Sequence, residues 1–128
     1  MKRSYIFWLF CGFTILNCMN LKAQENEIIV VQNHYWAKEG FEKDVYNQRL
    51  YASFVRDSLG LAKGRVLKRI SDKKNASHVI WECEYPNEEA RKEDVRKLTA
   101  SGAFEKVTTK MGTLIRKFDR IVYKVKTK

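Results

Sequence analysis

Two acidic residues and a histidine are the first candidates for chemistry in this sequence. Glu82 and Glu84 lie two apart in the segment HVIWECEYP, residues 78–86. Residues two apart in a strand share a face, so both carboxylates point to one side and Trp81 to the other. If the acidic side lines a cavity, His34 can act there as a general base near neutral pH. If that side meets water, the carboxylates only pair with arginines.

Further polar and aromatic residues on the neighbouring strands extend this candidate site. Asn33 can hydrogen-bond a reacting group, Trp36 can stack on a ligand, and Arg69 can bind an anionic group. Two carboxylates and one histidine are a weak metal-binding set, so no metal site is predicted. The predicted catalytic residues are His34, Asn33 and Glu82, and the predicted ligand-binding residues are Trp36, Arg69 and Glu84.

Two arginines on the first predicted helix leave two interpretations open. Arg49 and Arg56 lie seven apart and therefore on one helix face. They either bind an anion or face solvent, and solvent is the preferred interpretation. The apolar stripe of the same helix is expected at Phe41, Val45, Ala52, Val55 and Leu59, widened by Leu50 and Phe54.

The elements that position these residues follow from hydrophobic periodicity and turn residues. Their order is β-α-β-β-α-β, which predicts an α+β ferredoxin-like fold: a four-stranded antiparallel sheet with helices on one face. Asn87 is expected to cap a helix, and Gly102 to interrupt it. The predicted strands are 27–36, 64–71, 78–85 and 118–125, with a turn at 72–76, and the predicted helical segments are 41–60, 87–99 and 103–117.

Strand alternation assigns the two faces of the sheet. Two arrangements of the face without helices remain open: it is solvated and carries cross-strand ion pairs, or it packs on a second copy to form a dimeric barrel. The dimer is preferred because the apolar residues of that face would otherwise form an unusually large exposed surface. Residues expected to face the helices are Val66, Ile70, Val79, Trp81, Cys83, Tyr85, Ile121, Tyr123 and Val125. Residues expected on the open face are Gln32, His34, Trp36, Arg65, Leu67, Arg69, Ile80, Glu82, Glu84, Arg120, Val122 and Lys124.

Three segments give the chain a resemblance to a known superfamily. They are NHYWAKEGFEKDV (33–45), VIWECEYPNEEARKEDV (79–95) and SGAFEKV (101–107). The chain resembles the dimeric α/β barrel proteins, which include antibiotic-biosynthesis-monooxygenase-like and NIPSNAP-like domains. The resemblance implies a homodimer and a small-molecule ligand, and some members are cofactor-free oxygenases acting on aromatic or quinone substrates.

The haem-degrading branch of that superfamily shows which residues would be needed if haem were the cofactor. It uses an Asn on the first strand, a Trp near the end of the third, and a His after the Ser-x-x-Phe segment. Asn33 matches the first position, but the Trp position falls nearest Tyr85 and the His position at Thr108. Two of the three roles are unfilled, so no cofactor is expected, and haem is kept only as the alternative.

The first 24 residues are expected to be a bacterial signal peptide. Lys2 and Arg3 precede an apolar segment, residues 5–16, which is too short to span a membrane comfortably. Cleavage is expected close to Ala23, which gives a periplasmic or secreted domain of residues 25–128 with no stable membrane span. A lipoprotein attached at Cys18 and an uncleaved anchor are the alternatives.

The net charge indicates which classes of ligand the protein can bind, and the cysteine content indicates the state of Cys83. The whole chain carries 25 basic and 15 acidic residues, a net charge of +10. Removing Lys2, Arg3 and Lys22 with the signal leaves 22 basic and 15 acidic residues, a net charge of +7. Export and the lack of a recognition motif argue against nucleic acid, whereas anionic ligands fit the charge. Cys83 is then the sole cysteine and is expected to be a buried apolar residue.

These observations predict an exported dimeric domain that binds a small aromatic or anionic molecule in a cavity at the sheet. Whether it is an enzyme is left open. The first hypothesis is a cofactor-free, monooxygenase-like enzyme. The alternative is a non-catalytic binding or stress-associated protein.

Overall fold

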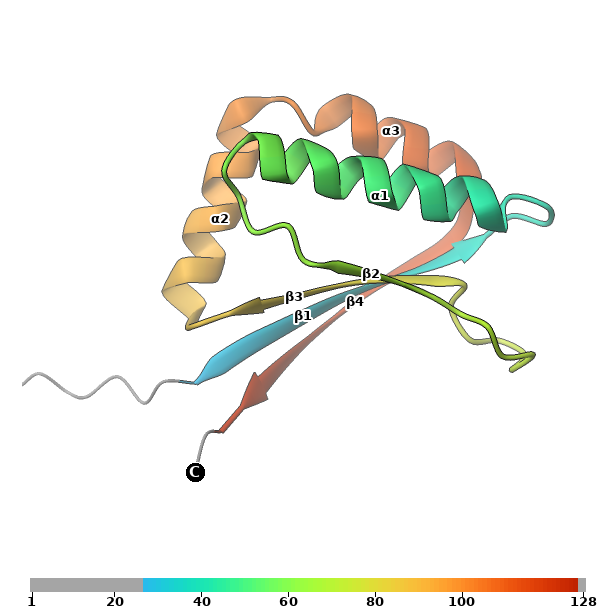
Figure 1. Cartoon of the computed structure of the whole chain (residues 1–128), viewed down its shortest axis with the longest axis horizontal. Coiled ribbons are helices and arrows are strands. Elements are labelled where there is room, and N and C mark those ends of the chain that lie inside the picture. The colour runs from blue at the N-terminus through green and yellow to red at the C-terminus, as the bar shows by residue number, and fades with distance from the viewer. Residues whose placement is uncertain (1–26, 127–128) are drawn as a thin grey trace, which may run out of the picture.

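The predicted order of elements is confirmed by a computed structural model of the chain, which describes residues 27–126. A four-stranded sheet lies under a layer of helices, and all helices lie on one side of it (Figure 1). The sheet order is β2-β3-β1-β4, as in a ferredoxin-like fold. The elements are β1 (Ile28–Ala37), α1 (Glu42–Ser58), β2 (Arg65–Lys68), β3 (Val79–Tyr85), α2 (Glu88–Ser101), α3 (Glu105–Leu114) and β4 (Ile115–Val125).

The central strand β1 sets the register of the whole sheet. It pairs antiparallel with β3, where Asn33 lies opposite Trp81, and with β4, where Asn33 lies opposite Arg120. The short strand β2 pairs with β3, and Val66 lies opposite Trp81. Directly opposed residues share a face, so one row of side chains crosses all four strands on the side of the helices.

The core lies between this face and the helices. Ile29, Val45 and Val79 are its largest fully buried side chains. Trp81 is buried as expected, and its Nε1 donates a hydrogen bond to the Lys63 carbonyl oxygen at 2.9 Å. Gly64 allows this approach: its φ is +66°, and a Cβ there would collide with the Trp81 indole.

The ends of the helices also follow from the sequence. The Asn87 side chain accepts a hydrogen bond from the Ala90 amide at 2.8 Å and caps α2. Gly102 has a φ of +64°, in the left-handed region, and separates α2 from α3. Cys83 is buried, as expected.

The face assignment of the last strand was wrong. Strand β4 begins at Ile115, inside the segment expected to be helical, and the register shifts where Ala37 and Trp36 face it. Ile121, Tyr123 and Val125 were expected to face the helices, but alternation alone cannot tell a covered face from an open one at a sheet edge. Phe118, Arg120, Val122 and Lys124 face the helix side, whereas Ile121, Tyr123 and Val125 share the open face with β1.

The buried face of α1 also differs from the prediction. Leu50 and Phe54 are exposed, Phe54 by 64%. Arg49 and Arg56, expected in solvent, are instead 3% and 4% exposed. The side of the helix toward the sheet carries these two arginines beside Val45 and Ala52, which are buried as expected.

The second strand is shorter than predicted. It ends at Lys68, so Ile70 is 96% exposed instead of facing the helices. Beyond it, the Arg69 guanidinium donates to the carbonyl oxygens of Lys73 and Ala76 at 2.9 and 2.5 Å and holds the turn.

His78 takes part in holding two strands together. Its Nδ1 accepts a hydrogen bond from the Ala37 amide at 2.9 Å, which ties the end of β1 to the start of β3. Burial, followed by the positive charge of Arg69, lowers the pKa of His78 from its usual 6.5.

No helix within residues 27–126 is long and apolar enough to cross a membrane. The expected signal peptide, with Cys18 and Ala23, lies outside the described residues.

We predict that His78 makes stability depend on pH. Because its pKa is lowered in the folded state, its contribution is complete above pH 6.5 and is lost as the pH falls through the folded pKa. His78→Asn places an uncharged acceptor near the same position. The free energy of unfolding should therefore fall more in the wild type than in the variant between pH 7 and pH 5. Urea unfolding at both pH values measures this, and equal losses would contradict it.

Candidate functional site

A cavity of about 380 Å³ lies between the helix-side face of the sheet and the three helices. Its walls come from β1, β3, β4 and every helix, so the whole fold positions it. The wall is mainly apolar and aromatic, as is usual for small-molecule sites. Apolar wall residues include Val31, Trp81, Leu98, Phe104, Met111 and Phe118, and polar wall residues include Asn33, Tyr35, Arg49, Arg56, Tyr85, Arg91 and Arg120.

Arg49 is the central polar group of this cavity. Its guanidinium carbon lies 4.8 Å from the centroid of the Trp81 ring, a cation–π contact. Its Nε is buried without a hydrogen-bond partner, and none of the described carboxylates forms an ion pair with it. Burial lowers the pKa of Arg49 from its usual value because the charged form loses hydration. An arginine nevertheless stays protonated in a protein, so the cavity contains an uncompensated positive charge.

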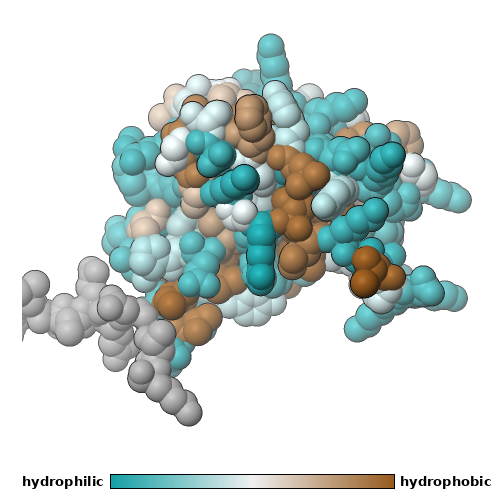
Figure 2. All heavy atoms as spheres, viewed as in Figure 1, coloured by the Kyte–Doolittle hydropathy of each residue, from teal (hydrophilic) through white to brown (hydrophobic). Residues whose placement is uncertain are grey.

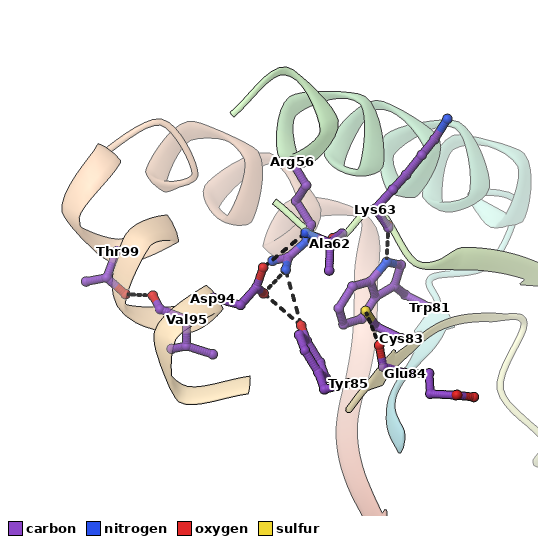
Figure 3. A network of polar contacts seen from close by, with 10 residues as sticks. All are labelled: Arg56, Ala62, Lys63, Trp81, Cys83, Glu84, Tyr85, Asp94, Val95 and Thr99. Atoms are coloured by element: carbon purple, nitrogen blue, oxygen red, sulfur yellow. Dashed lines mark hydrogen bonds and ion pairs between the residues drawn. The ribbon is translucent and has the colours of Figure 1, made fainter. Parts of the chain in front are cut away.

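Arg56, two turns further along α1, is in the opposite situation. It lies over the same indole at 4.9 Å, but it also forms a buried ion pair with Asp94 of α2 (Figure 3). Asp94 further accepts hydrogen bonds from the Tyr85 hydroxyl at 2.7 Å and from the Ala62 amide at 3.1 Å. Burial, followed by the contact with Asp94, raises the pKa of Tyr85, which stays a neutral donor. This network fixes α1, α2 and β3 to one another.

Asn33 and Arg120 form the opposite side of the cavity. The Arg120 Nε donates to the Asn33 Oδ1 at 2.8 Å, and the two residues are paired across β1 and β4. With its oxygen engaged in this way, the Asn33 amide nitrogen is left to donate to a ligand. Asn33 is therefore the one predicted site residue that lies in this cavity.

His34, the neighbour of Asn33, lies on the other side of the sheet. Consecutive strand residues point to opposite faces, so the two residues cannot act on one ligand. The two ring nitrogens of His34 contact the Ser77 Oγ at 2.9 Å and the Gln32 Oε1 at 3.0 Å.

The acidic pair also lies on the open face. Glu82 accepts hydrogen bonds from Gln32 at 2.6 Å and from Arg65, with which it also forms an ion pair at 2.5 Å. These contacts, with Gln32 the larger cause, lower the pKa of Glu82. Pairing with Arg65 was among the expected partnerships. Glu84 is exposed two residues further on.

Trp36 and Arg69 lie beside His34 in a second, more open hollow of about 570 Å³. The Trp36 Nε1 donates to the Asn75 carbonyl oxygen at 3.0 Å, and Lys117 lies 4.4 Å from its ring centroid. Within residues 27–126, no three His, Cys, Asp or Glu side chains are grouped closely enough to hold a metal ion. The six predicted site residues are thus divided between two faces, and their functional roles stay predictions.

Solved structures of similar fold support the predicted ferredoxin-like fold class. A NIPSNAP family protein from Agrobacterium tumefaciens matches with a TM-score of 0.59 and 17% identity, over 75% of this chain and 90% of that one. A dimeric ferredoxin-like protein of unknown function from Bacteroides fragilis matches with a TM-score of 0.55 and 11% identity, over 77% and 96%. SnoaB of Streptomyces nogalater, a cofactor-independent oxygenase, matches with a TM-score of 0.50 and 18% identity, over 80% and 96%. No protein-family model matches the sequence, and no curated protein matches it.

The chain shares the ferredoxin-like fold of these structures. At these identities the similarity concerns the fold alone, and the site must be argued from its own residues. Those residues do not fit the haem-degrading type of dimeric α/β barrel. Thr108 stands in this cavity where that branch has a histidine, and its hydroxyl donates to carbonyl oxygens of its own helix region, Phe104 and Glu105. Both described histidines lie outside the cavity wall.

We predict opposite effects on stability for the two buried arginines. Arg56→Met leaves Asp94 buried without its cation and should lower the free energy of unfolding by about 3–5 kcal/mol. Arg49→Met removes an uncompensated buried charge and should leave stability within about 1 kcal/mol of the wild type or raise it. Chemical denaturation of both variants measures this. An equal large loss in both would show that Arg49 is also satisfied by the fold.

Proposed function

We propose that the cavity between sheet and helices binds a small molecule with an aromatic body and an anionic group. The uncompensated charge of Arg49, buried in a mainly apolar cavity, is the observation that carries this proposal. Leaving such a charge unpaired costs folding free energy, which a bound anion would recover. Selection for binding gives a reason for tolerating that cost.

Each part of the cavity has a separate task in this proposal. Arg49 pairs with the anionic group, and the Asn33 amide donates a further hydrogen bond. Trp81 and Phe118 line the space for a flat ring. The network around Asp94 keeps Arg56 neutralised, so the ligand is directed to Arg49.

The same geometry favours binding over catalysis. The described wall contains no histidine and no carboxylate, so it supplies no ordinary general base. Binding is therefore the function that the geometry supports best. Cofactor-free oxygenation, the activity of the similarly folded SnoaB, is the second candidate. It would need a substrate that is already anionic at neutral pH, and Arg49 is the group that would stabilise such an enolate or phenolate.

We predict that an aromatic anion binds through Arg49. The probe is 8-anilinonaphthalene-1-sulfonate, and N-phenyl-1-naphthylamine is its neutral counterpart with the same rings. Arg49→Met should weaken binding of the sulfonate about tenfold or more, because one charge-assisted contact is lost. Binding of the neutral probe should not change. Fluorescence titration measures both affinities.

Arg96→Met is the matched control. Arg96 is an exposed residue of α2 that pairs with Glu93 outside the cavity, so its removal should change neither affinity. If Arg49→Met and Arg96→Met weakened sulfonate binding equally, the effect would be due to the net charge of the protein, and the proposal would be contradicted.

We also propose that a second copy of the chain covers the open face of the sheet. Leu67, Tyr123 and Val125 leave substantial apolar surface uncovered there, and the similar B. fragilis structure is described as dimeric. Leu67→Glu should then shift sedimentation from dimer to monomer. Leu50→Glu, at a comparably exposed position of α1, should not. A wild-type protein that sediments as a monomer at micromolar concentration would contradict this.

The location of the protein rests on the sequence alone. We propose that residues 1–24 direct export and that the domain acts in the periplasm or outside the cell. The charged segment before an apolar stretch of signal-peptide length supports this proposal.

A further inference from the structure

The wall of the cavity carries an excess of positive charge, and this excess is larger than one anionic group can neutralise. Four arginines belong to its wall, whereas no described Asp or Glu does. Arg56 is paired with Asp94, and Arg91 forms an ion pair with Glu88 at 2.7 Å. Arg49 and Arg120 have no carboxylate partner among residues 27–126. Two positive charges therefore remain for a ligand.

These two charges lie at different depths. Arg49 belongs to a helix and is 3% exposed, whereas Arg120 belongs to the edge strand β4 and is an exposed residue. Only the Nε of Arg120 is engaged, by Asn33. Its two terminal nitrogens form no hydrogen bond or ion pair with a described side chain, although the guanidinium carbon lies 5.8 Å from the Phe118 ring centroid. They therefore keep four N–H donors in the fork that suits a carboxylate.

The sheet register fixes the line between the two charges. Trp81, Asn33 and Arg120 lie side by side on three adjacent strands. Neighbouring strands are about 4.8 Å apart, so this row spans about 10 Å. Arg49 lies over Trp81 at one end, Arg120 is at the other, and the Asn33 amide lies between them.

We propose that the ligand is an elongated dianion with acidic groups at its two ends. One end pairs with Arg49 inside the cavity, and the other pairs with Arg120 at its edge. The body between them lies along the row over Asn33, against Trp81 and Phe118. This inference rests on the proposed function of the same cavity and adds the second acidic group.

The test compares three ligands with one aromatic frame: 2-naphthoate, 2,6-naphthalenedicarboxylate and its monomethyl ester. The ester has nearly the shape of the diacid and only one charge, so it controls for size without any substitution. Isothermal titration of the wild type should give a dissociation constant about tenfold lower for the diacid than for either monoanion. Arg120→Met should reduce the ratio of the diacid and monoanion affinities to less than twofold, and this ratio cancels any change in the cavity that affects all three ligands alike.

Arg116→Met is the matched control, because Arg116 lies on the same strand and outside the cavity wall. It should keep the preference for the diacid. Equal affinity of the wild type for diacid and ester, or a preference that survives Arg120→Met, would overturn the inference while the proposed function stands. If 2-naphthoate itself does not bind through Arg49, the proposed function fails, and the dianion inference fails with it.

Discussion

The buried carboxylate of Asp94 is the contact on which the cavity depends. It accepts hydrogen bonds from Arg56 of α1, from the Tyr85 hydroxyl at the end of β3, and from the Ala62 amide in the loop between α1 and β2. A carboxylate can leave water only when such donors replace its hydration. Asp94 therefore fixes α2 against α1 and β3, and the cavity is the space enclosed by these elements together with α3 and β4. On the face seen in Figure 2, hydrophilic side chains predominate around a narrow apolar strip that runs from the helix layer toward the sheet.

Arg49 and Arg56 of α1 share one environment but differ in whether their charge is neutralised. Both stack on Trp81 at nearly the same distance, and both are almost fully buried. Arg56 is neutralised by Asp94, and this ion pair stabilises the packing of α1 against α2. The other has no described counter-charge, so the electrostatic potential of the cavity is set at one point rather than spread over its wall.

The fold could be predicted from the sequence, because it depends on local patterns that survive in the structure. Alternation identified β1 and β3, and Asn87 and Gly102 marked the helix boundaries. The faces of β4 could not be assigned in this way. The helices leave most of this edge strand exposed, so its apolar residues can lie on the open side, as Ile121 and Tyr123 do.

The site was harder to predict, since charge was taken as a sign of solvent exposure. Arg49 was assigned to solvent, although its spacing of seven from Arg56 already raised the alternative of an anion site. The signal was available in Val45 and Ala52, which share that face with Arg49 and are buried. His34, by contrast, was selected for its chemistry, and its strand position beside Asn33 already directed it to the other face.

The short β2 strand gives the molecule unequal flanks. On one flank, β4 contributes eleven residues to the sheet, and on the other β2 contributes four. The long flank carries Arg120 and holds the rim of the cavity on a continuous ladder of backbone hydrogen bonds. The short flank leaves the segment after Lys68 to be held by side chains such as Arg69. Insertions and substitutions should therefore accumulate around residues 69–77, where they change the surface of the molecule without disturbing the cavity between the sheet and the helices.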